Sequence, residues 1–183
     1  MNQTVSIRDS FIQAFLSLIK QMPLSSLTVV ALIKEADVSH QSFYRHFTDK
    51  YQLAETICYD NFKLFTTIYG ENASWKEVIT CMLNIIKNNP SFYRKLLSDK
   101  EGSTVLIKSI LSIFSEHSGC SISIYSVNSW LLIIKDWSYK NFSVPVDEIY
   151  TRLLHNMSIS DIMQGDDLTQ TTTCYENLRL SEL

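Results

Sequence analysis

The sequence predicts an all-α protein, with three short helices followed by a larger helical domain. Only four glycines and three prolines occur in 183 residues. Apolar residues recur at intervals of three and four, as on one face of a helix, instead of alternating as in a strand. The chain is 45% hydrophobic and 19% charged, so it can bury a substantial core.

The first expected helix ends near Pro23, because the residue before a proline disfavours helical geometry. Its apolar stripe consists of Ile7, Phe11, Ala14, Phe15, Leu18 and Met22. Thr28 is a suitable N-cap for a second helix. The inner face of that helix would hold Val29, Leu32, Ile33 and Ala36.

A tight turn at Asp37 and Val38 separates the second helix from a third. Ser39 is expected to cap the third helix, and Phe43 and Phe47 face inward one turn apart. Three short helices therefore share one small core, and two of them are joined by a turn of a few residues.

A long fourth helix is expected to start after Asp49, which forms a capping-box pattern with Gln52, and to end at Gly70. The periodicity predicts further helices at residues 74–87, 90–98, 103–117, 121–141 and 146–157. We therefore divide the chain into a domain at 1–49 and one at 50–183. About the last 20 residues, including the polar stretch 165–174, are expected to be loosely ordered.

Composition limits the class of protein. The N-terminus lacks an apolar signal-like region, and no apolar run is long enough to span a membrane, so we expect a soluble, cytoplasmic protein without a membrane partner. The scattered cysteines are expected to be reduced thiols: Cys58, Cys81, Cys120 and Cys174. Residues 1–50 carry a net charge of +1 and the remainder −4, so contact with a polyanion is expected at the N-terminal end.

The outward face of the third helix has the polar side chains of a DNA-reading helix-turn-helix. Gln41 can bond bidentately to adenine and Arg45 to guanine, whereas Ser42 and Tyr44 can donate to phosphate. Lys50 adds a nearby cation. The expected DNA-binding residues are Thr28, Ser39, His40, Gln41, Ser42, Tyr44, Arg45, His46 and Lys50. An ordinary solvated helix face is the alternative, and His46 could instead cap or pack locally.

The same residues resemble the N-terminal signature of TetR-type regulators. The resemblance rests on TVVALIKEADVS at 28–39, QSFYRHFTDK at 41–50 and Leu53, and covers residues 7–57. It implies a dimeric transcription regulator whose two heads enter successive major grooves of a palindromic operator. Asp37 stands where the family usually has glycine, and Val30 where a polar or basic residue is common.

The C-terminal residues 129–137 and 141–149 resemble the family's last two main helices, which usually form a four-helix dimer interface. Independently of the resemblance, the helix that contains residues 129–137 has more apolar surface than a monomer core of this size should need, and Trp is favoured at interface centres. The expected homodimer interface comprises Trp130, Ile133, Ile134, Trp137, Ile149 and Leu153.

The central helices are the expected place for an effector. An apolar pocket would be lined by Phe62, Phe65, Trp75, Met82, Tyr93 and Tyr125, although helical spacing predicts the same residues as plain core. Residues 75–99 resemble more loosely a subgroup that includes the activator of the dihydroxyacetone kinase operon. That likeness implies a protein effector in place of a small molecule, and activation in place of repression.

Three other readings are weaker. A metal site could combine His117 and Cys120 with Cys58, Cys81 or His155, but isolated cysteines in helical proteins are usually core residues, so no metal or cofactor is expected. An enzyme is not expected, because glycine-rich phosphate loops, nucleophile elbows and HExxH motifs are missing. A helical protein-interaction adaptor or co-regulator with weak or lost DNA binding is the main alternative, and salt-dependent binding to duplex DNA would distinguish it.

Overall fold

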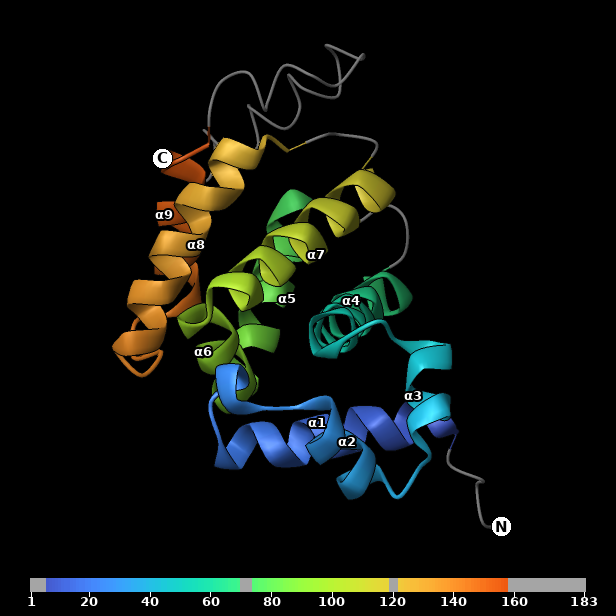
Figure 1. Cartoon of the computed structure of the whole chain (residues 1–183). Helices are drawn as coiled ribbons and strands as arrows, with labels where there is room; N and C mark the ends of the chain where they lie inside the picture. The colour runs from blue at the N-terminus through green and yellow to red at the C-terminus, as the bar shows by residue number, and fades with distance from the viewer. Residues whose placement is uncertain (1–5, 70–73, 119–121, 158–183) are drawn as a thin grey trace.

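The computed structural model describes residues 6–69, 74–118 and 122–157, and within them it is all-α, as predicted (Figure 1). The elements are α1 (Ile7–Gln21), the 3₁₀ turn η1 (Leu24–Ser26), α2 (Val29–Ala36), α3 (His40–His46), α4 (Lys50–Tyr69), α5 (Trp75–Asn88), α6 (Pro90–Ser98), α7 (Lys100–Ser118), α8 (Ile124–Tyr139) and α9 (Val146–His155). The expectation for the C-terminal tail concerns residues outside those described.

The expected N-caps are present. The Thr28 hydroxyl accepts from the Ala31 N–H at 3.2 Å, which satisfies one of the free donors at the start of α2. At α4, Asp49 accepts from the Gln52 N–H at 2.9 Å. The Gln52 side chain reaches back to the Thr48 N–H, one residue before the partner of a standard capping box. Short polar patterns in the sequence therefore place these helix starts.

An aromatic cluster forms the core of the three N-terminal helices. The Phe11 ring of α1 meets the Phe43 ring of α3 edge-on, with centroids 5.2 Å apart. Phe47 lies 6.2 Å from Phe11 and 5.7 Å from Phe43. All three side chains are buried, so α3 is held against α1 from its inner side.

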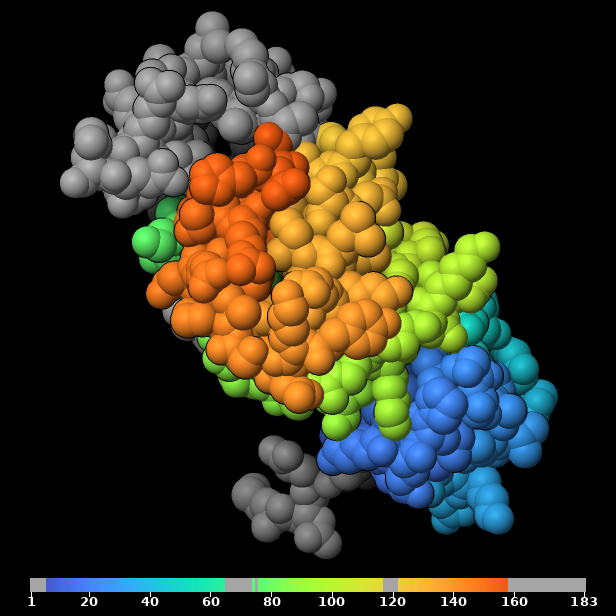
Figure 2. Space-filling model, turned by 90° about the vertical axis from the view of Figure 1, so that its left-hand side faces the viewer, coloured from blue at the N-terminus to red at the C-terminus, as the bar shows by residue number. Residues whose placement is uncertain are grey.

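We call the three N-terminal helices, α1 to α3, the head. Helices α4 to α9 form a second layer above it, which we call the body. In Figure 1, α7 crosses the centre of the molecule with α5 behind it, α4 lies to its right, and α6 lies at its lower left end. Phe114 of α7 packs edge-on against Trp130 of α8, with centroids 5.7 Å apart. Figure 2 shows α8 and α9 lying side by side on one face of the molecule.

Contacts between α1 and α6 help to join the head to this body. Phe15 of α1 packs against Phe92 of α6, with ring centroids 5.9 Å apart. The Lys95 ammonium of α6 donates to the backbone oxygens of Ile19 and Met22, the latter at 3.0 Å. It thereby satisfies carbonyls that the end of α1 leaves free.

The connection between α8 and α9 explains why α8 ends before its expected limit at residue 141. Asn141 and Phe142 both have left-handed backbones, with φ of 53° and 54°. The Phe142 N–H bonds the Trp137 oxygen at 2.9 Å, which closes the helix end in the manner of a Schellman motif. The Phe142 ring then packs edge-on against Trp137.

None of the described helices combines the length and the apolar character that crossing a membrane requires.

Candidate nucleic-acid interface

The turn between α2 and α3 depends on a left-handed residue. Asp37 has φ 51° and ψ 46°, and its N–H bonds the Ile33 oxygen. The Val38 N–H also reaches Ile33, at 3.3 Å. Asp is among the few non-glycine residues that occupy this region at modest cost, so the helix-turn-helix geometry survives without glycine.

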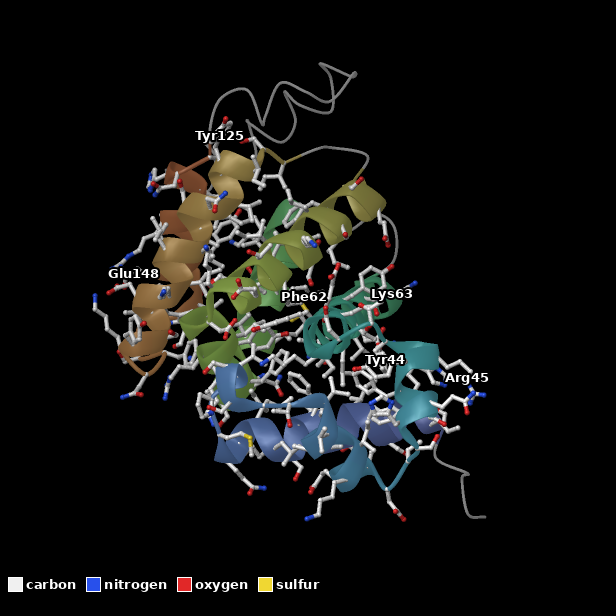
Figure 3. All side chains as sticks on the ribbon, viewed as in Figure 1. Tyr44, Arg45, Phe62, Lys63, Tyr125 and Glu148 are labelled. Carbon is white, nitrogen blue, oxygen red and sulfur yellow. The ribbon has the colours of Figure 1, made fainter. Side chains whose placement is uncertain are left out.

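One face of α3 is buried and the other is open. Phe43 is fully buried, whereas His40, Gln41, Tyr44, Arg45 and His46 are exposed. Figure 3 shows the Arg45 side chain pointing away from the rest of the molecule. A helix with this arrangement presents its polar side chains to solvent while its backbone stays fixed.

The exposed face of α3 is polar and carries no carboxylate. Tyr44 is 52% exposed, and its ring lies 4.8 Å from the His40 ring, centroid to centroid. Neither Gln41 nor Arg45 makes a side-chain hydrogen bond to the residues described. Their amide and guanidinium groups are therefore available to an outside partner.

The predicted hydroxyl contacts serve first as caps. Ser39 accepts from the Ser42 N–H at 3.1 Å, and the two hydroxyls are 2.9 Å apart. Thr28, also a cap, is exposed. A hydroxyl that accepts a backbone N–H still has its own hydrogen to donate. One hydroxyl hydrogen is used between Ser39 and Ser42, so that pair keeps one free donor, and Thr28 keeps its own.

Lys50 does not occupy the position expected of a phosphate contact. Its ammonium donates to the backbone oxygens of Leu24, Ser25 and Leu27, at 2.7, 3.1 and 2.9 Å. An ammonium has three hydrogens, and all three are used. In this structure the Lys50 ammonium therefore fastens η1 to the start of α4 and is not a free cation beside α3.

Two exposed residues of α2 were not among the predicted contacts. Val30 is 70% exposed at the second position of α2, and Lys34 is exposed in its last turn. An exposed valine at a helix start and a lysine among apolar neighbours are both common in surface helices, so neither gives a distinctive sequence signal.

Most of the side chains expected at a dimer interface are buried within one protomer. Five are at most 1% exposed: Trp130, Ile134, Trp137, Ile149 and Leu153. Ile133 is half-buried. The Trp130 indole donates to the Leu153 oxygen at 2.8 Å, which joins α8 to α9. This correction has a physical reason: the aromatic face of α8 packs on α7 and α9.

The exposed apolar face of α8 consists of other residues. Ile124, Tyr125, Leu132 and Tyr139 are 49, 81, 71 and 61% exposed. Tyr125, Leu132 and Tyr139 are spaced by seven residues and therefore lie on one stripe of the helix. This placement also corrects the expectation that Tyr125 lines an internal pocket.

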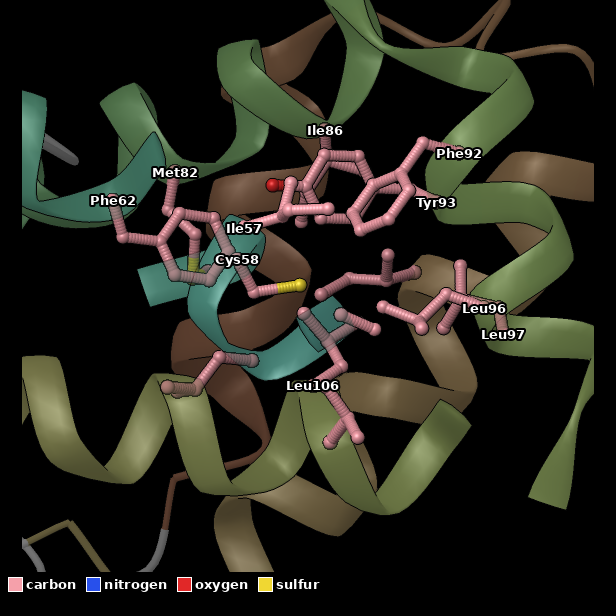
Figure 4. Close-up of a cluster of buried hydrophobic side chains, with 14 of the residues drawn as sticks. Ile57, Cys58, Phe62, Met82, Ile86, Phe92, Tyr93, Leu96, Leu97 and Leu106 are labelled. Atoms are coloured by element: carbon pink, nitrogen blue, oxygen red, sulfur yellow. The ribbon is translucent and has the colours of Figure 1, made fainter. Parts of the chain in front are cut away.

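A small apolar void lies between described residues of α4, α5 and α7. Its volume is about 10 Å³, about one water molecule. Phe62 and Met82 line it, and Figure 4 shows them adjacent within the packed core. Tyr93 is buried and stacks on Phe62, with centroids 6.1 Å apart. The expected Phe65 and Trp75 side chains lie outside the described part of the structure.

The two cysteines in the described part of the structure, Cys58 and Cys81, are free thiols. Cys58 is fully buried, which raises the pKa of its thiol, and Cys81 is half-buried. The described residues include no group of three or more His, Cys, Asp or Glu that could hold a metal ion. The expected alternatives His117 and Cys120 have side chains outside the described residues.

The fold and the interface together define the class: a helix-turn-helix protein with an all-helical C-terminal body. Residues 11–57 match the family of bacterial regulatory proteins called the tetR family. The chain thus has the N-terminal domain and the fold of a TetR-family transcriptional regulator. No curated protein sequence matches it.

Solved structures share this fold. A TetR transcriptional regulator from Streptococcus agalactiae is 20% identical, with a TM-score of 0.56 over 83% of this chain and 94% of that one. A TetR-family regulator from Syntrophomonas wolfei is 15% identical, with a TM-score of 0.57 over 84% and 93%. The dihydroxyacetone kinase operon activator DhaS is 15% identical, with a TM-score of 0.51 over 84% and 97%.

Proposed function

We propose that the chain is a dimeric transcription regulator that binds a palindromic operator and answers to an effector. The observation that carries this proposal is the outward face of α3, where Gln41, Tyr44 and Arg45 are exposed on a helix fixed from behind by Phe43. Placed in the major groove, Gln41 would read adenine and Arg45 guanine, while Tyr44 would donate to a phosphate.

The hydroxyls around α3 support the same placement. Thr28 and the one free hydroxyl hydrogen of the Ser39–Ser42 pair would bind phosphates on either side of the groove and set the register of the helix. His40 and His46 are exposed on the same short helix and complete the polar surface. Lys50 has no part in this proposal, because its ammonium is already occupied.

Dimerisation would use the exposed stripe of α8. Tyr125, Leu132 and Tyr139 offer apolar surface at a heptad spacing, which suits packing against the same helix of a second copy. Large exposed apolar residues in a row favour a partner surface over solvent. Two heads held by such a dimer would meet two half-sites of a palindrome.

Effector control would act on how the two heads are spaced. An apolar effector that enlarged the void of about 10 Å³ between the described residues would separate α4 from α7. Separation of α4 from α7 would move the N-terminal end of α4, to which the three N-terminal helices are attached. The similarity of this fold to that of DhaS is consistent with a regulator of the operon-activator subgroup.

The test is a selection of genomic fragments with the purified protein, followed by a salt titration of the best fragment. The proposal requires an enriched palindrome whose affinity falls as salt rises, because phosphate contacts release counterions. The absence of any enrichment at low salt would favour the alternative of a protein-interaction adaptor.

A further inference from the structure

An open cleft lies between α1, α4 and α7. Its volume is about 360 Å³, which is in the range of about 300–1,000 Å³ typical of small-molecule sites. All of its lining residues are polar, and Arg8 comes from α1, Glu55 and Asp60 from α4, and Ser112 from α7. The cleft differs in size and character from the small apolar void in the core.

Glu55 is the group in this cleft that lacks a counter-ion. It is half-buried, and its carboxylate has no hydrogen bond or ion pair with any of the residues described. The nearby cation Arg8 is already bonded to Asp60, with Nη2 and Oδ2 2.5 Å apart. The cleft therefore has one uncompensated negative charge.

Two hydroxyls near Glu55 in the cleft already donate their hydrogens within the protein. The Thr56 hydroxyl gives its hydrogen to the Gln52 oxygen at 3.0 Å, and the Tyr59 hydroxyl gives its hydrogen to Glu116 at 2.6 Å. The Thr56 oxygen keeps lone pairs that can accept a bond, whereas the Tyr59 oxygen also accepts from the Lys63 ammonium at 3.5 Å. A positively charged group with N–H donors therefore suits the part of the cleft around Glu55 and Thr56.

We propose that this cleft binds a small hydrophilic amine, with Glu55 as its counter-ion. An amine seated beside Glu55 would also reach the Asp60 carboxylate and compete with Arg8 for it. Because Arg8 lies in the first turn of α1, this competition would loosen the link between α1 and α4. The effect on DNA rests on the proposed function, whereas the binding of the amine does not.

The first experiment uses isothermal titration calorimetry with putrescine, and butane-1,4-diol as the uncharged counterpart of the same length. Putrescine is expected to bind the unchanged protein and the diol is not. Glu55→Gln removes the charge at nearly constant shape and should weaken putrescine roughly tenfold or more. Glu101 is an exposed carboxylate at the start of α7, outside the cleft. The control variant Glu101→Gln should leave the affinity for putrescine unchanged.

Equal binding of putrescine and the diol, or unchanged affinity in Glu55→Gln, would overturn the proposal, and so would the absence of any putrescine heat at millimolar concentration. Circular dichroism of each variant reports whether it folds. If Glu55→Gln loses its helical signal, the comparison of the two compounds on the unchanged protein still decides the outcome.

The second experiment measures operator affinity with and without putrescine. The amine should change the affinity of the unchanged protein but not that of Glu55→Gln. Constant affinity in the unchanged protein would overturn the link through Arg8. Calorimetry involves no DNA, so failure of the amine site and failure of the proposed DNA binding give different results.

Discussion

Gln41 and Arg45 act individually, because neither side chain has a hydrogen-bond partner within the described protein. In the proposed complex they would supply recognition, and they contribute almost nothing to folding, since neither is buried. Substitutions there should change DNA binding while leaving the free energy of unfolding unchanged.

Arg45→Ala is expected to relax base preference at one position of each half-site. Loss of a bidentate contact to guanine should cost about 1–3 kcal/mol against the preferred base and little against the other three. Competition binding with operators mutated one position at a time measures this. A uniform loss of affinity for all these operators would show that Arg45 contacts phosphate instead of a base.

Lys50→Met is expected to lower the free energy of unfolding by about 2 kcal/mol, because three backbone oxygens lose a charged donor. Urea unfolding measures the loss. The slope of operator affinity against salt should stay the same, since the ammonium touches no phosphate. Lys34→Met, at an exposed position of α2, is the matched control and should leave stability nearly unchanged.

Burial of Cys58 predicts a loss of stability in alkali. Burial raises the pKa of its thiol, so the folded protein keeps a proton that the unfolded chain releases near pH 8.5. Stability is therefore complete below that pH and falls above it, by up to about 1.4 kcal/mol per pH unit for one group. Cys58→Ala should reduce this slope in urea midpoints measured from pH 8 to 10.5.

Cys81→Ala provides the comparison. Burial also raises the pKa of Cys81, but this thiol is only half-buried, so its removal should change the alkaline slope less. A larger change in Cys81→Ala than in Cys58→Ala would contradict the assignment. Tyr93 and Tyr51, whose pKa values burial also raises, contribute to the slope that remains.

At this scale, sequence reasoning succeeded where the partner is local. The caps at Thr28 and Ser39 act within three residues, so their neighbours in the sequence are enough to predict them. Lys50 bonds carbonyls 23 to 26 residues earlier in the chain. No local pattern indicates that bond, and a lysine beside a reading helix is the ordinary pattern for a phosphate contact.

Among the elements, the turn after α2 is the one in which residue type and backbone conformation conflict. Asp37→Gly is expected to raise the free energy of unfolding by about 0.5–1 kcal/mol, because glycine occupies left-handed φ without a Cβ clash. Asp37→Val should lower it by about 1–2 kcal/mol. Urea unfolding of both variants tests the order, and a more stable valine variant would contradict it.

The orientation of α8 shows what periodicity alone cannot settle. Both of its faces carry large apolar side chains, with Trp130 and Trp137 on one and Leu132 and Tyr139 on the other. The sequence predicts such a helix to be buried on two sides, but it does not say which face packs within the protomer. Contacts with α7 and α9 decide that, and they depend on the whole fold.

At the scale of the whole molecule, the dimer proposed through α8 can be tested with one substitution. Leu132→Asp puts a charge in the centre of the exposed stripe and should give a monomer by light scattering at micromolar concentration. Leu64→Asp, at a 59% exposed position of α4, is the matched control and should keep the mass of the unchanged protein. If the Leu132→Asp variant is still a dimer, the dimer interface lies on another face of the protein.

The order of the described helices followed well from the sequence, because most of their starts have a local side-chain cap, although α6 and α9 do not, and each stripe has a regular period. The degree to which the three N-terminal helices are independent of the other helices did not follow from the sequence. A boundary at residues 49 and 50 marks the start of α4, but Phe15 packs on Phe92 across it. Such contacts involve residues far apart in the chain and have no local signature.

The Lys95 ammonium has a consequence for protein engineering. It bonds two backbone oxygens at the end of α1, so the last turn of that helix is completed by a side chain from α6. A chimera that grafts the reading helices onto another regulator would lose this lysine unless α6 came with them. The smallest transplantable unit is therefore set by packing, and it extends beyond the continuous segment that carries the helix-turn-helix.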